Sequence, residues 1–137
     1  MCKVYKHGNK TTVIQTEWFS PLQCRENPEY LYVFGDNTMR RGKGGQAIIR
    51  DELNTFGVVT KKLPSQYPNS FFSGSLEEEI MILNDLTKLE KIYISGRTIV
   101  LPAAGLGTGL SELPTRAPEL DKLIKDFIQI HLLRESE

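Results

Sequence analysis

The sequence is poor in the residues that most often bind metals or act as nucleophiles. Among 137 residues it has two cysteines and two histidines, and neither pair has the spacing of a zinc site. We therefore expect no metal, and we assign no cofactor. Cys2 and Cys24 could form a disulfide, but a reducing compartment favours two free thiols.

Long apolar runs are also missing from the chain. None approaches the roughly 20 residues that a helix needs to span a bilayer. The amino terminus has no apolar stretch behind a basic start, as a signal peptide would have. We therefore expect a cytoplasmic protein that does not contact membranes.

The composition has no extreme that would exclude a folded domain. Apolar residues make up 39% and charged residues 25% of the chain, as in globular proteins, and its length fits a single domain over residues 1–137. The net charge is zero, but residues 1–62 hold ten Lys/Arg and six Asp/Glu, whereas residues 63–137 hold seven and eleven. Nucleic-acid binders are more often basic throughout, so this imbalance favours a local anion site.

Segments of strand-like and helical patterning alternate along the chain. The expected strands are 3–5 and 11–16, paired as a hairpin across Gly8-Asn9, then 29–34, 58–63 and 98–101. The expected helices are 48–56, 76–89 with a capping box at Ser75 and Glu78, and 116–133. Residues 92–94 are either a further strand or the approach to the last one. This alternation predicts an α/β fold, a three-layer α/β/α domain with a mixed central sheet.

Two glycine-rich loops, 42–45 and 105–109, each follow a predicted strand and precede a predicted helix. Glycines let the backbone turn sharply and expose bare N–H groups, to which a helix start adds partial positive charge. Two such loops at the carboxyl edge of one sheet would hold a diphosphate from two sides. Neither loop has a Walker A or a G-x-G-x-x-G pattern, which disfavours a P-loop enzyme and a Rossmann fold.

Both loops resemble those of macro domains. The run Leu101–Leu110 resembles their second phosphate loop, and the run Gly42–Ile48, preceded by Asp36 and Asn37, is similar to their first loop. The chain would be a short and divergent member of that family. The resemblance implies a domain that binds ADP-ribose, a related nucleotide diphosphate or an ADP-ribosylated protein, and some macro domains also hydrolyse ADP-ribosyl derivatives.

The resemblance also gives candidate catalytic residues. Macro domains carry a Gly-Asp-Ile/Val turn and a separate Asn-Ala-Asn motif, and here the single run Gly35-Asp36-Asn37 must stand for one or the other. The spacing favours Asn37 as the residue that orients the distal ribose, and Asp36 could act as the general base. No second acid is evident, so hydrolysis and binding without turnover both stay open.

The residues expected to contact the ligand are Gly42, Gly44, Gly45, Gln46, Ala104, Gly105, Leu106, Gly107, Thr108, Gly109 and Leu110. One alternative is a module that reads or sequesters a nucleotide signal without turnover. Another is a nucleic-acid accessory protein that uses the basic 40–62 segment and the aromatic residues of 67–72 as a stacking platform.

Some side chains allow two interpretations. Trp18 and Phe19 belong either to the core or to a lid over a pocket, and the large apolar area of both rings favours the core. The aromatic residues of 67–72 either pack down or close over a ligand. A solvated strand end is favoured over phosphate binding for Lys61 and Lys62.

Overall fold

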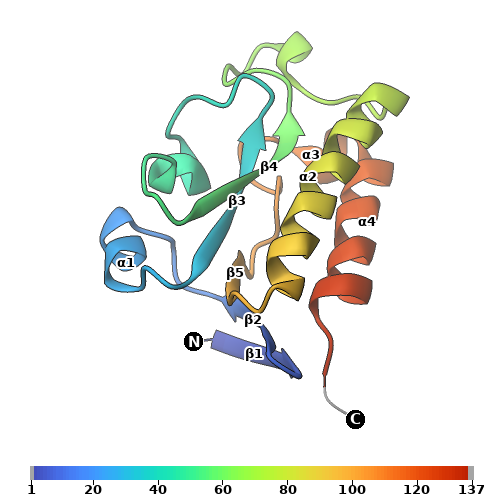
Figure 1. The fold of residues 1–137 in the computed structure, drawn as a ribbon. Coiled ribbons are helices and arrows are strands. Elements are labelled where there is room, and N and C mark those ends of the chain that lie inside the picture. The colour runs from blue at the N-terminus through green and yellow to red at the C-terminus, as the bar shows by residue number, and fades with distance from the viewer. Residues whose placement is uncertain (1, 136–137) are drawn as a thin grey trace.

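A computed structural model describes residues 2–135. At its centre is a mixed five-stranded sheet in the order β1-β2-β5-β3-β4 (Figure 1). The strands are β1 (Cys2–His7), β2 (Lys10–Gln15), β3 (Leu31–Asn37), β4 (Thr55–Lys61) and β5 (Ile99–Pro102). β1 and β2 form the antiparallel hairpin that the sequence predicted, whereas β2, β5, β3 and β4 are parallel. The α/β class with a mixed sheet is therefore confirmed.

The helices differ widely in length. They are α1 (Pro21–Glu26), α2 (Leu76–Ile94), α3 (Leu113–Arg116) and α4 (Pro118–Phe127), with the short 3-10 helices η1 (Gly45–Ile49) and η2 (Pro68–Ser70) and the π-helix η3 (Ile128–Leu132). The predicted capping box of α2 is confirmed, because the Ser75 hydroxyl accepts from the Glu78 N–H and the Glu78 carboxylate accepts from the Ser75 N–H. Residues 92–94 form the end of α2 rather than a strand.

Neighbouring residues of the central strands pack on opposite faces of the sheet. Val33 and Leu101 belong to a core cluster with buried residues of α2 and α4, while Phe34 and Val100 belong to a second cluster with residues of α1 and η1. Figure 1 shows α2 and α4 side by side on one side of the sheet and α1 on the other. Burial on both faces explains why these strands lack apolar–polar alternation.

The four parallel strands end at one edge of the sheet, and the glycine loops lie at this edge. The chain leaves β2 toward Trp18, β3 toward the 38–46 loop, β4 toward Pro64 and β5 toward the 103–111 loop. Ligand sites of α/β sheets typically lie outside the carboxyl ends of the strands. Topology thus brings four separate parts of the chain to one place.

The predicted helix over residues 48–56 is wrong. The chain forms only the short η1, then turns, and β4 begins at Thr55, which pairs with Tyr32. The buried Asn54 side chain donates hydrogen bonds of 2.9–3.0 Å to three carbonyls of residues 24–30. These tertiary contacts hold the segment in a non-helical conformation despite its helical periodicity.

The predicted helix over residues 116–133 is interrupted. α3 ends at Arg116, Ala117 has φ −147° and ψ 71°, and Pro118 begins α4. Proline has no N–H and disfavours the α conformation of the preceding residue, so it suits the first turn of a helix but separates two helices. The last predicted turns, over residues 128–132, form the π-helix η3.

The structure also bears on membranes, metals and thiols. Over residues 2–135, no helix has the length and apolar character needed to cross a membrane. Within the same residues, no three His, Cys, Asp or Glu side chains gather as a metal site requires. Cys2 is an exposed free thiol, and Cys24 is a buried one. Burial raises the pKa of Cys24 to about 11.

Candidate functional site

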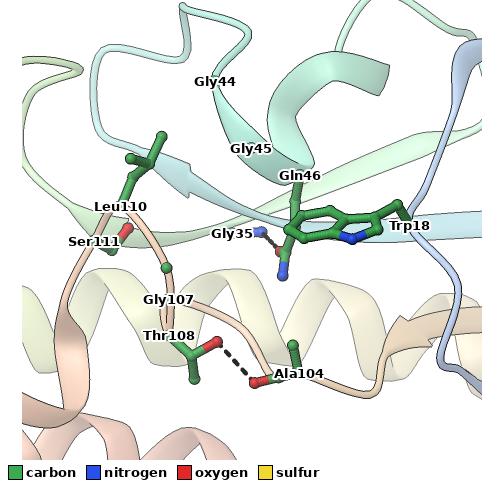
Figure 2. A pocket seen from close by; sticks show the side chains of 11 residues that line it. Trp18, Gly35, Gly44, Gly45, Gln46, Ala104, Gly107, Thr108, Leu110 and Ser111 are labelled. Atoms are coloured by element: carbon green, nitrogen blue, oxygen red, sulfur yellow. Dashed lines mark hydrogen bonds between the residues drawn. The ribbon is translucent and has the colours of Figure 1, made fainter.

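A cavity of about 380 Å³ opens at the carboxyl edge of the sheet (Figure 2). We call it the first cavity. Its lining comes from the ends of three parallel strands: Trp18, Gly35, Gly44, Gly45, Gln46, Ala104, Gly107, Thr108, Gly109, Leu110 and Ser111. Its volume lies within the range of pockets for small ligands, roughly 300–1,000 Å³. It brings together eight of the predicted binding residues.

The two glycine loops carry backbone N–H groups without a protein acceptor. Among residues 2–135, none accepts a hydrogen bond from the N–H groups of residues 41–46 or 106–111. Gly107, within the second run, is buried. Buried N–H groups are nearly always paired, and successive free N–H groups form anion-binding concavities. The N–H group of the buried Gly107 therefore lacks an acceptor among the described residues, and the N–H groups of the exposed residues 41–45 are available to donate to an anionic ligand.

Long helices do not follow these loops, contrary to the sequence prediction. η1 has five residues and α3 has four, and the macrodipole needs several aligned peptide units. The predicted charge contribution from the helix starts is thus not available. The loops must attract an anion through their own N–H groups.

Gln46 connects the two loops across the first cavity. Its Oε1 accepts from the Gly35 N–H at 2.9 Å, and its Nε2 donates to the Gly105 carbonyl at 2.9 Å. The Thr108 hydroxyl donates to the Ala104 carbonyl at 2.7 Å and closes the second loop (Figure 2). Gln46 and Thr108 therefore hold the shape of the cavity with their polar atoms.

The glycines of the first cavity differ in the space around them. A Cβ on Gly44 would lie 2.8 Å from the Leu110 Cδ1, and a Cβ on Gly107 would lie 2.8 Å from the Thr60 Cβ. Gly107 also has φ +81°, which disfavours any side chain. A Cβ on Gly109 would meet nothing within 4 Å. Gly109 is thus the position where a side chain can be added without a clash.

A second cavity, of about 210 Å³, adjoins the first. Both are lined by Gly35, Gly44, Leu110 and Ser111. The remaining lining of the second cavity consists of Asp36, Asn37, Arg41, Gly42, Lys43, Ala47, Arg50, Lys61 and Pro64. Its lining is far richer in charged side chains than that of the first cavity.

Asp36 lines the second cavity, but its carboxylate is occupied. It accepts from the Arg40 guanidinium at 3.3 Å, from the Arg50 guanidinium at 3.1 and 2.5 Å, and from the Asn37 N–H at 2.8 Å. A carboxylate has about four lone-pair sites, so these donors use its capacity. The geometry makes Asp36 an anchor for two arginines and does not support the predicted role of general base.

Asn37 also uses its side chain within the protein. Its Nδ2 donates to the Arg41 carbonyl at 2.7 Å, and its Oδ1 accepts from the Met39 N–H at 3.0 Å. Arg50 Nε donates to the Gly42 carbonyl at 2.7 Å. Asn37 and Arg50 thus shape the first glycine loop, and the amide predicted to orient a ribose is engaged in that loop.

Lys61 is a buried cation, which corrects the expectation of a solvated strand end. Only 4% of the residue is exposed. Its Nζ donates to Gln66 Oε1 and to the Leu110 carbonyl at 3.3 Å, and it lies 4.9 Å from the centre of the Phe71 ring. Burial lowers the pKa of Lys61, and Glu112 partly opposes this. The position of Lys61 within the parallel strand β4 was the signal that could have indicated burial.

Two predicted binding residues lie outside both cavities. Leu106 is buried in the core cluster that includes residues of α2 and α4, so it anchors the second loop. Gly105 accepts the Gln46 hydrogen bond through its carbonyl. Leu106 and Gly105 therefore hold the second loop in place and do not line either cavity.

The aromatic residues divide differently from the sequence prediction. Phe19 is buried, but Trp18 is 81% exposed and lines the first cavity. Figure 2 shows the Trp18 ring extending toward Gln46. Phe71 and Phe72 are buried, whereas Tyr67 is exposed. Most of the 67–72 loop therefore packs down and does not form a stacking platform.

Comparison with known proteins places the chain in a family. No curated protein and no solved structure matches it. The model of a family of unknown function, DUF7831, matches residues 14–127. The match includes both glycine loops, Trp18 and Lys61. This chain belongs to the DUF7831 family, whose function is unknown.

Proposed function

We propose that this chain is a macro-domain-like module that binds ADP-ribose or a related nucleotide diphosphate at the first cavity, in the cytoplasm. The observation that carries the proposal is the pair of N–H runs, 41–46 and 106–111, that have no acceptor among the described residues. Each phosphate of a diphosphate offers anionic oxygens that accept several such hydrogen bonds. The small residues of both loops leave room for it.

Trp18 supports a ligand that also carries a flat ring. Its indole is exposed at the first cavity, where a base can stack on it. Stacking of a base on an aromatic side chain contributes roughly 1–3 kcal/mol. A nucleotide whose diphosphate contacts the loops therefore gains a second contact from its base.

The site supports binding more strongly than hydrolysis. The Asp36 oxygens already accept from Arg40 and Arg50, and the Asn37 amide is engaged in the first loop. We therefore assign no catalytic residue. Gly44 and Gly109 are exposed, so a nucleotide that is attached to a protein can also reach the loops.

Titration of the purified protein with ADP-ribose, ADP and AMP tests the proposal. Trp18 is the only tryptophan, so quenching of its fluorescence reports occupancy of the first cavity, and calorimetry gives the stoichiometry. We expect one-to-one binding, with AMP weaker because it has a single phosphate. Absence of saturable binding of both ADP-ribose and ADP would refute the ligand class.

A side chain at Gly109 tests the position of the site. Gly109→Glu adds a carboxylate at a residue that lines the first cavity and whose Cβ would meet nothing within 4 Å, and we expect ADP-ribose affinity to fall at least about tenfold through repulsion of the diphosphate. Leu53→Glu is the matched control, because Leu53 is fully exposed and lines neither cavity. Equal affinity of both variants would place the ligand elsewhere.

The nucleic-acid alternative makes a different prediction about salt. Its affinity should fall steeply between low and high salt, whereas nucleotide binding in the first cavity should change much less. The burial of Phe71 and Phe72 removes the platform on which that alternative relied. Tight, salt-dependent binding of single-stranded RNA or DNA, without ADP-ribose binding, would favour it again.

A further inference from the structure

The second cavity combines four cationic side chains with one carboxylate, Asp36. The cationic side chains are Arg41, Lys43, Arg50 and Lys61. Arg50 pairs with Asp36, and Lys43 pairs with Asp51. Within the described chain, no carboxylate forms an ion pair with the other two, Arg41 and Lys61. The cavity therefore has an excess of positive charge.

Of the two cations without an ion pair, Lys61 is the buried one, whereas Arg41 is exposed. An ammonium group has three donors, and the structure supplies two neutral oxygen acceptors, from Gln66 and Leu110. The next residue, Lys62, is exposed and lies 3.5 Å from the Glu78 carboxylate. Glu112 acts on Lys61 electrostatically, but among residues 2–135 no carboxylate lies within ion-pair distance of it, and a buried charge without a close counter-charge is costly. An anion in the second cavity would supply the missing partner of Lys61.

The backbone of the first loop adds donors to the same cavity. The carbonyls of Arg41 and Gly42 are occupied by Asn37 and Arg50, whereas the N–H groups of 41–44 have no acceptor among residues 2–135. The loop therefore offers donors rather than acceptors to a ligand. A neutral sugar could use some of these donors but would leave the Lys61 charge unpaired.

We propose that the second cavity is a phosphate subsite, so that the preferred ligand state has a phosphate group beyond the diphosphate in the first cavity. This inference rests on the proposed function. The cavities share Gly44 and Leu110 in their linings, and about 210 Å³ is ample for a phosphate group. That phosphate is either the terminal group of the same nucleotide or a separate inorganic phosphate ion.

The test compares ADP with ATP by calorimetry at constant ionic strength, without divalent cations. If the third phosphate of a nucleotide enters the second cavity, ATP should bind about tenfold more tightly than ADP, as a few hydrogen bonds to charged groups would give. If a separate ion enters it, ATP should gain nothing, but millimolar inorganic phosphate should tighten ADP binding. If neither the advantage of ATP nor the effect of inorganic phosphate is observed, the proposal is overturned.

Two neighbouring lysines provide a matched pair of variants. Lys61→Met should abolish the advantage of ATP, or the effect of inorganic phosphate, so that ATP loses roughly tenfold more affinity than ADP does. Lys62→Met should change neither, because Lys62 does not line the second cavity. Arg41→Gln alters an exposed side chain and should weaken the same effect without disturbing the fold. Equal losses for ADP and ATP in Lys61→Met would overturn the proposal.

The failures of the two proposals can be told apart. If ADP and ADP-ribose bind but neither phosphate effect is seen, the second subsite is refuted and the nucleotide cavity stands. If neither nucleotide binds, the proposed function is refuted, and direct titration with inorganic phosphate then decides on the second cavity. Binding of phosphate that Lys61→Met removes and Lys62→Met retains would support the subsite, and absence of binding would refute it.

Discussion

Replacement of Asp36 by asparagine tests whether this residue holds the site together. Only 2% of its side chain is exposed, and it faces Arg50, whose side chain is 14% exposed, and Arg40, whose side chain is 46% exposed. Asparagine keeps the size but removes the charge and directs an N–H group toward arginine donors. The substitution therefore leaves the Arg50 charge without its carboxylate.

The expected loss of stability in Asp36→Asn depends on the contacts that Arg40 and Arg50 retain. Arg40 retains two 2.9 Å hydrogen bonds to Asp85, so its loss is small. Arg50 retains the carbonyls of residues 41 and 42 and its position 5.3 Å from the centre of the Phe34 ring, but no carboxylate. Breaking a buried ion pair costs about 3–5 kcal/mol, and the retained contacts favour the lower end. A loss of about 3 kcal/mol corresponds to roughly 10 °C in the unfolding midpoint for a domain of this size.

Urea denaturation followed by far-ultraviolet circular dichroism measures this loss. Fluorescence is unsuitable because Trp18 is already exposed in the folded state. Asp51→Asn is the control, since its ion pair with Lys43 is more than half exposed on both sides and should contribute less than about 1 kcal/mol. If Asp36→Asn were as stable as the unmodified protein, the structural role would be refuted, and a selective loss of turnover would restore the general-base hypothesis.

Three further predictions concern single residues. Gly107→Ala should lower the free energy of unfolding by about 2 kcal/mol in urea denaturation, because the new Cβ would collide with Thr60 and because residue 107 has φ +81°, which disfavours a side chain. Unchanged stability would refute the close contact. Lys61→Met should raise stability by about 1 kcal/mol at neutral pH by removing a desolvated charge. The unfolded state binds the Lys61 proton more tightly than the folded state, so this gain should shrink as the pH rises toward the ordinary lysine pKa of 10.5. Thermal melts at several pH values measure the gain, and a gain that stays constant would contradict the prediction. A thiol reagent should modify Cys2 quickly in the native protein and Cys24 only on unfolding, since burial raises the pKa of Cys24 to about 11; rapid modification of both would contradict the burial.

Local sequence patterns correctly predicted those helices and strands whose local conformational preference agrees with their tertiary contacts. The capping residues Ser75 and Glu78 and the apolar spacing that follows them indicated α2, because both signals operate within one or two turns. The segment 48–56 had similar spacing, yet Leu53 is fully exposed and β4 begins at Thr55. Pairing with β3 and the Asn54 hydrogen bonds outweighed a helix preference of a few tenths of a kcal/mol per residue.

The candidate site was predicted in outline from its glycines. The two loops do meet at one cavity, because strand–loop–helix order places loops at the carboxyl edge of a parallel sheet. Trp18 follows β2 and lies far from both loops in sequence. Trp18 reaches the first cavity because β2 pairs with β5, and no pattern among neighbouring residues of the sequence predicts that pairing.

The sequence by itself determined the α/β class, the amino-terminal hairpin, the start of α2 and the glycine loops, since each depends on residues close together in the chain. Only the tertiary structure decided that Asp36 is held by Arg40 and Arg50, that Lys61 is buried and contacts Leu110, and that Trp18 lines the first cavity. Charge pairing and burial depend on which segments the sheet order brings together. The same residue types therefore have different roles according to neighbours that are distant in the sequence.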